Sequence, residues 1–145
     1  MRTAVDTNII SALWSSEPLA RKMAELLTQL LSEGGLALCA PVYAELLAHP
    51  RVSEGFVAAF LASTRITVDY GLGEEVWLAA GNAYAAYAQR RRRSRADAPK
   101  RLLIDFVVGA HASLRADQLL TLDASRYRHS FPQLRLVTER GAEAG

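Results

Sequence analysis

Short apolar runs alternate with longer helical patterns along almost the whole chain, and this alternation constrains the fold most. The runs predicted as strands are 3–5, 36–40, 66–68, 119–122 and 136–137. Between them, Leu, Ala and aromatic residues recur at helical spacing, most clearly over 19–31 and 74–91. Strands separated by helices indicate an α/β fold with a mainly parallel sheet covered on both faces.

The length of the chain predicts a single domain. Its 145 residues, half of them apolar, are enough to bury a core without disulfides. The one cysteine, Cys39, can form no internal disulfide and lies in an apolar run. We expect residues 1–140 to form the domain and 141–145, rich in Gly and Ala, to be a flexible tail.

The first apolar stretch is interrupted by Asp6, so it does not look like a signal peptide. No apolar run approaches the roughly 18 to 20 residues that a membrane-spanning helix needs. We therefore expect a soluble, cytoplasmic protein.

Positive charge is concentrated in one segment, although the net charge is only +2. Residues 90–101 hold seven Arg or Lys and a single acid, Asp97, whereas the remaining chain has ten basic and fourteen acidic residues. Such a segment is typical of contact with a polyanion. The alternative is a solvated helix end whose cations complement the helix dipole. The candidate RNA- or partner-binding residues are Arg90, Arg91, Arg92, Arg93 and Arg95.

Four acids stand at positions that a parallel sheet would bring together. Asp6 ends the first predicted strand and Asp123 ends the fourth. Glu45 lies one turn into the helix after the second strand, and Asp105 lies in the first turn of the helix before the fourth. Because ligands bind beyond the carboxyl ends of parallel strands, we expect these acids to form one site.

The surroundings of these acids suggest a metal. Each is flanked by apolar residues, and buried carboxylates are costly unless they are paired or bound to a cation. Converging carboxylates also repel one another, which a divalent ion would relieve. Their oxygens suit Mg²⁺ or Mn²⁺.

Each acid also has a purely structural explanation. Asp6 could cap the following helix, Asp105 could favour a helix N-terminus, and Asp123 could start a turn. Glu45 could point into solvent. Their coincidence at one sheet edge favours the metal site over four separate accidents.

The motifs resemble those of the PIN-domain family, and within it VapC-type toxins of bacterial toxin–antitoxin pairs. They are Val5-Asp6-Thr7-Asn8, Tyr43-Ala44-Glu45-Leu46, Ile104-Asp105 followed by Gly109-Ala110-His111-Ala112, and Thr121-Leu122-Asp123 before Tyr127. The resemblance covers roughly residues 1 to 138.

The resemblance implies a three-layer α/β/α fold with a five-stranded parallel sheet and Mg²⁺- or Mn²⁺-dependent cleavage of RNA. It also implies that Asp6, Glu45, Asp105 and Asp123 are the acidic metal ligands, with Asn8 and Thr121 supporting them. Family members are usually dimers that a cognate antitoxin neutralises. The arginine run is denser than the family pattern, and Phe106 is bulky for its position.

Two rival functions stay open. One is a non-catalytic module that binds nucleic acid or protein through Arg90–Arg95, its acids serving only as caps. The other is an aspartyl phosphatase, but that chemistry usually needs a second acid two residues after the first, where this chain has Asn8.

Overall fold

The computed structural model describes residues 1–16, 18–94 and 100–143, and within them a six-stranded sheet forms the centre. The strand order is β3-β2-β1-β4-β5-β6, with the first five parallel and β6 antiparallel to β5. The strands are β1 (Thr3–Val5), β2 (Leu36–Cys39), β3 (Ile66–Asp69), β4 (Gln118–Leu120), β5 (Arg135–Thr138) and β6 (Gly141–Ala142).

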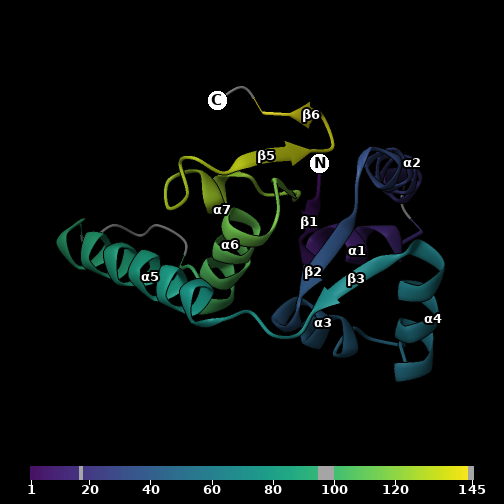
Figure 1. Ribbon diagram of the computed structural model, residues 1–145, viewed down its shortest axis with the longest axis horizontal. Helices are drawn as coiled ribbons and strands as arrows, with labels where there is room; N and C mark the ends of the chain where they lie inside the picture. The colour runs from purple at the N-terminus through teal and green to yellow at the C-terminus, as the bar shows by residue number, and fades with distance from the viewer. Residues whose placement is uncertain (17, 95–99, 144–145) are drawn as a thin grey trace.

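Helices cover both faces of the sheet (Figure 1). They are α1 (Thr7–Leu13), α2 (Pro18–Glu33), α3 (Ala40–Leu47), α4 (Glu54–Thr64), α5 (Glu74–Ser94), α6 (Leu103–Arg115) and the short α7 (Ser125–Arg128). The chain moves outward from β1 to β3 and then returns to place β4 on the other side of β1. Right-handed crossovers then put α1, α2 and α4 on one side of the sheet and α5 and α6 on the other.

Local sequence signals explain several helix starts. The Ser53 hydroxyl accepts a hydrogen bond from the Phe56 backbone N–H at 3.1 Å and caps α4. Pro41 stands in the first turn of α3, where its missing N–H costs nothing.

The core fills the space between the central strands and the helices on either side. The strands β1, β2 and β4 are buried along their whole length, as expected of strands covered on both faces. On one side of the sheet α6 buries seven consecutive residues, 106–112. Gly109 has to be small because the Phe131 ring occupies the space that a side chain would need.

The predicted α/β class is confirmed, and the number of strands differs. The sheet has six strands rather than five, because residues expected in the flexible tail pair with β5: Val137 faces Ala142 and Thr138 faces Gly141. Gly141 has a φ of 102°, which glycine adopts easily and other residues rarely do. Among the described residues, no helix is long and apolar enough to span a membrane.

Candidate active site

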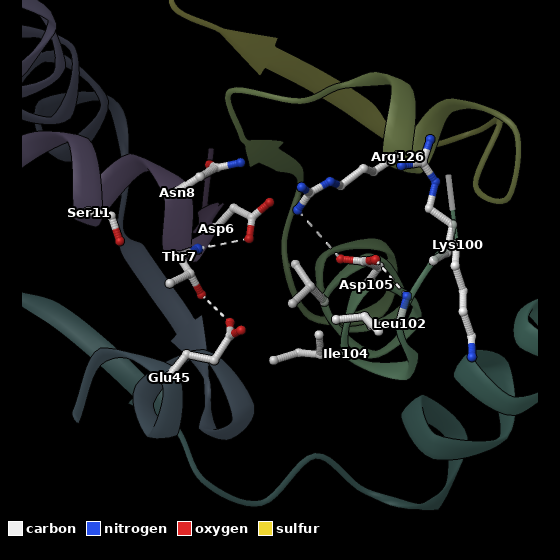
Figure 2. Close-up of a pocket in the computed structure, with 12 residues that line it drawn as sticks. Asp6, Thr7, Asn8, Ser11, Glu45, Lys100, Leu102, Ile104, Asp105 and Arg126 are labelled. Atoms are coloured by element: carbon white, nitrogen blue, oxygen red, sulfur yellow. Dashed lines mark hydrogen bonds and ion pairs between the residues drawn. The ribbon is translucent and has the colours of Figure 1, made fainter. Parts of the chain in front are cut away.

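The candidate site lies where the strand order reverses, between β1 and β4. Val5 pairs with Leu120, so the residues that follow these strands, Asp6 and Thr121, emerge side by side. This is the switch point at which parallel sheets bind ligands. A cavity of about 430 Å³ opens here (Figure 2). Its charged lining residues are Asp6, Glu45 and Asp105 on the acidic side, and Lys100, Arg101 and Arg126 on the basic side.

Asp6 is the most buried of the acids, with 5% of its surface exposed. Its Oδ1 accepts a hydrogen bond from the Thr7 backbone N–H at 2.8 Å, so it does cap α1. Its Oδ2 accepts hydrogen bonds from the hydroxyls of Thr121 at 2.9 Å and Tyr127 at 2.7 Å. Burial nevertheless raises the pKa of Asp6, because it outweighs these hydrogen bonds.

Asn8 and Thr121, the predicted supporting residues, are hydrogen-bonded to each other beside Asp6. The Thr121 hydroxyl accepts hydrogen bonds from the Asn8 side-chain amide at 3.3 Å and the Asp123 backbone N–H at 3.1 Å. The side-chain Oδ1 of Asn8 accepts a hydrogen bond from the Leu122 backbone N–H at 3.1 Å. These bonds tie the start of α1 to the segment that follows β4. Tyr127, which completes the set around Asp6, was not predicted as a site residue, although it closes the last motif.

Glu45 reaches the cavity from α3. Its Oε1 accepts a hydrogen bond from the Thr7 hydroxyl, which links it to the helix that Asp6 caps. Glu45 is exposed to solvent but lines the cavity, so it does not simply point away. Thr7 is a site residue that the sequence analysis missed. Its place directly after Asp6, in the first turn of α1, is the signal that could have found it.

Asp105 and Asp123 both meet Arg126. The Nε of Arg126 lies 2.8 Å from Oδ2 of Asp123, and its Nη1 lies 3.8 Å from Oδ1 of Asp105. Asp105 also uses Oδ2 to accept a hydrogen bond from the Leu102 N–H at 3.1 Å, at the start of α6. Figure 2 shows the Arg126 guanidinium extending toward Asp105 and Asp6, with Arg126 and Asp105 on one side of the view and Asp6 on the other.

Asp123 differs from the prediction. It does not end β4, which stops at Leu120, and it is not among the residues that line the cavity with the other acids. It lies in the turn before α7, where its Oδ1 accepts a hydrogen bond from the Ser125 hydroxyl at 2.5 Å. Burial acts to raise its pKa, but this bond and the charge of Arg126 hold the pKa of Asp123 below its usual value. The structure thus gathers three of the four acids in one cavity.

The donor set fits a divalent cation in chemistry and in location. Three carboxylates from β1–α1, α3 and α6 share a cavity at the switch point, and their oxygens are hard ligands. Within the described parts of the chain, however, no three His, Cys, Asp or Glu side chains are grouped closely enough to hold an ion. Their side chains point to Thr7, Leu102 and Arg126 instead. The exposed Glu45 side chain can rotate quickly, so its hydrogen bond to Thr7 does not forbid binding.

The arginine run is divided by the fold. Residues Arg90–Arg93 lie at the end of α5, away from the cavity lining, and Arg95 lies outside the described residues. The chain then returns to the site: the Tyr87 hydroxyl accepts hydrogen bonds from the Arg101 backbone N–H at 2.7 Å and from Arg91 Nη1 at 3.3 Å. Of this basic segment, Lys100 and Arg101 line the cavity, although they were not predicted as binding residues.

Fold and site together define an α/β protein with an acidic cavity at the switch point of a parallel sheet. The model of the PIN domain family matches residues 3–131. The chain belongs to the PIN-domain family, whose members are in general nucleases. Among curated proteins, no sequence relative matches.

Solved structures support this assignment over nearly the whole chain. A chain of VapBC-1 from nontypeable Haemophilus influenzae is 26% identical, with a TM-score of 0.66, and 97% of this chain aligns with 99% of that one. VapBC2 from Rickettsia felis, bound to a promoter DNA fragment, gives a TM-score of 0.71 at 18% identity and coverages of 95% and 98%. DNA-bound VapBC from Salmonella typhimurium gives 0.64 at 17% identity and coverages of 96% and 98%. The resemblance to VapC-type PIN proteins is confirmed in fold.

Proposed function

We propose that this protein is a Mg²⁺- or Mn²⁺-dependent endoribonuclease that acts as the toxin of a type II toxin–antitoxin system. The observation that carries the proposal is the convergence of Asp6, Glu45 and Asp105 on one cavity at the switch point of a PIN fold. The raised pKa of buried Asp6 adds to it, because carboxylates with uncompensated charge cluster at functional sites.

The reaction would be hydrolysis of a phosphodiester bond. A bound divalent ion would lower the pKa of a water and stabilise charge on the phosphate oxygens. Asp6 and Asp105 are the proposed direct ligands, and Glu45 and Asp123 would bind the ion or orient its waters. Thr121 and Tyr127 fix the orientation of Asp6, and Thr7 does the same for Glu45. One carboxylate would accept a proton from the attacking water.

Positive charge beside the acids supports an RNA substrate. Lys100, Arg101 and Arg126 line the cavity, and Arg90–Arg93 extend the basic surface along α5. Phosphates that bind such side chains release counterions, which adds affinity. We propose that both groups contact RNA, with Lys100 and Arg101 nearest the cleaved bond. Arg90–Arg93 would contact either RNA or an acidic segment of the antitoxin.

The proposed partners are a cognate antitoxin, as in the VapBC complexes, and a second copy of the chain. Trp77 and Leu78 are more than half exposed on α5, which is unusual for large apolar side chains and is consistent with a covered surface in a dimer. A cytoplasmic location is part of the same proposal. Sedimentation of the purified protein, alone and with the product of a neighbouring antitoxin gene, would test both partners.

The decisive experiment maps cleavage of total RNA with Mn²⁺ and with EDTA. Wild type should cut RNA only with Mn²⁺. The Mn²⁺-dependent cleavage rate of Asp105→Asn should be at least about 100-fold lower than that of wild type. Glu25→Gln is the matched control, because Glu25 is exposed on α2 and pairs only with Arg21 among the described residues. Equal Mn²⁺-dependent cleavage by the folded Asp105 variant would contradict the proposal.

A binding module without catalysis is the second candidate, because Asp6 caps α1 and Asp105 accepts a backbone hydrogen bond at the start of α6. In that case RNA or protein would bind without Mn²⁺, and neither acid would be needed. The same assay separates the two candidates when binding and cleavage are measured together.

A further inference from the structure

Arg126 faces the acidic cavity from the short helix α7. Within the described part of the chain it is the one ion-pair partner of both Asp105 and Asp123. Its charge also acts on Asp6, whose pKa it lowers against the larger effect of burial. One cation is therefore shared among three of the four acids that the sequence singles out.

The two contacts of Arg126 are unequal, and this shapes what the side chain can do. The Nε–Oδ2 distance of 2.8 Å to Asp123 is a full hydrogen-bonded ion pair, whereas the 3.8 Å from Nη1 to Asp105 is a looser contact. The side chain of Arg126 is 41% exposed, whereas that of Asp105 is only 12% exposed. The guanidinium can therefore leave toward solvent, but the carboxylate cannot follow it.

We propose that Arg126 is the built-in counter-ion of the acidic cavity. In the cation-free protein it neutralises Asp105 and Asp123, and it has to withdraw from them before their oxygens can bind a divalent ion. This inference rests on the proposed metal-dependent function of the same carboxylates. It explains why the acids share a cavity although no three of the described His, Cys, Asp or Glu side chains are grouped for an ion.

Two opposite effects follow when Arg126 is replaced. Without the guanidinium, the acids keep their mutual repulsion and the cation-free protein becomes less stable. A divalent ion then no longer competes with the cation that pairs with Asp105 and Asp123. It therefore binds more tightly, even though Lys100 and Arg101 still line the cavity. A merely structural arginine would show the first effect without the second.

The experiment measures Mn²⁺ affinity by calorimetry, together with melting temperature in EDTA, for wild type and Arg126→Gln. We expect the Kd for Mn²⁺ to fall at least about fivefold and the melting temperature in EDTA to fall as well. Arg126→Lys keeps the charge without the planar fork and should lie between them. The matched control is Arg128→Gln, because Arg128 stands on the same helix but pairs with Glu143 outside the cavity.

Equal or weaker Mn²⁺ binding by Arg126→Gln would overturn the inference while leaving a metal-dependent nuclease intact. If Arg126→Gln does not fold, unchanged affinity in Arg126→Lys would overturn it in the same way. Tighter binding by Arg126→Gln, in a protein whose wild type does not cleave RNA, would support the inference and refute the proposed function. Failure of both wild type and variant to bind Mn²⁺ would refute both.

Discussion

Two aspartates at the carboxyl ends of parallel strands, β1 and β3, have opposite surroundings in this fold, with β2 lying between the two strands. Asp69, at the end of β3, pairs with Arg2 at 3.0 Å and with the buried His111 at 2.7 Å. Burial acts to raise the pKa of Asp69, but these partners hold that pKa below its usual value. Asp6, at the end of β1, has hydroxyl and amide partners but no ion pair among the described residues, and burial raises its pKa.

The contrast distinguishes a structural acid, Asp69, from the acid that we propose to be functional, Asp6. At Asp69 the charge is compensated by Arg2, the residue just before β1, and by His111 of α6, so the cluster ties the end of β3 to a helix. At Asp6 the hydrogen bonds and the more distant charge of Arg126 do not outweigh the effect of burial on the pKa. A buried carboxylate without an ion-pair partner beside a cavity is costly to the fold, and such a cost is typical of active sites.

The largest expected effect is that replacing Asp6 removes cleavage but not stability, whereas replacing Asp69 removes stability but not cleavage. Asp6→Asn should lose at least about 100-fold of Mn²⁺-dependent RNA cleavage while melting near the wild-type temperature. Asp69→Asn should lose about 2 kcal/mol of unfolding free energy, because Arg2 and His111 lose their charged partner. Denaturant melts and cleavage rates on both variants check this. Large loss of cleavage in a well-folded Asp69→Asn protein would break the comparison.

The basic residues that line the cavity should contribute more to RNA binding than those at the end of α5. With Ca²⁺ or EDTA present to prevent cleavage, Lys100→Ala with Arg101→Ala should weaken binding about tenfold, and Arg91→Ala with Arg92→Ala should weaken it less. Both pairs should reduce the salt dependence of the affinity. Fluorescence anisotropy against salt concentration measures both. The reverse order would place the RNA along α5 rather than at the cavity.

A smaller effect is expected at Tyr127, whose hydroxyl donates to Asp6 in a buried setting. Tyr127→Phe should cost about 1 kcal/mol of stability at neutral pH, because the ionised carboxylate loses a donor. The loss should be smaller at a pH where Asp6 is protonated. Urea melts at two pH values test this, and an equal loss at both would contradict it.

The smallest effect is a pair of opposite pH trends. Since the pKa of Asp69 is lowered from 3.8, its stabilisation is present above that value and disappears as pH falls through the folded pKa. Since the pKa of Asp6 is raised from 3.8, its ionisation costs stability as pH rises through the folded pKa. In EDTA, the loss of unfolding free energy caused by Asp69→Asn should become smaller toward acidic pH. The unfolding free energy of Asp6→Asn should rise relative to wild type toward neutral pH. Parallel trends would break the comparison.

The sequence predicted most of the fold because hydrophobic periodicity marks long helices and buried strands. It missed α7 and β6, which have too few residues to show a period. It placed Asp6 and Asp105 correctly, since one follows a strand and the other opens a helix. It misplaced Asp123 because strand β4 ends at Leu120, two residues before the end of the apolar run 119–122.

Side-chain pairings were harder to predict. Thr7 contacts Glu45, and Arg126 contacts Asp123. These contacts depend on side-chain rotamers and on the turn before α7, which hydrophobic periodicity does not predict. The pairing of Asp69 with Arg2 and His111 joins residues 67 and 42 positions apart in the chain. Such contacts depend on strand order and helix rotation, which become known only when the chain is folded.

The most direct test of the central claim is the thermal shift produced by Mn²⁺ on wild type and on Asp6→Asn. A site that binds only in the folded state raises the melting temperature with ligand concentration. We predict a Mn²⁺-dependent rise for wild type that is absent or much smaller for Asp6→Asn. Identical shifts in the two proteins, or no shift in wild type, would contradict the assignment of this cavity as a metal-dependent active site.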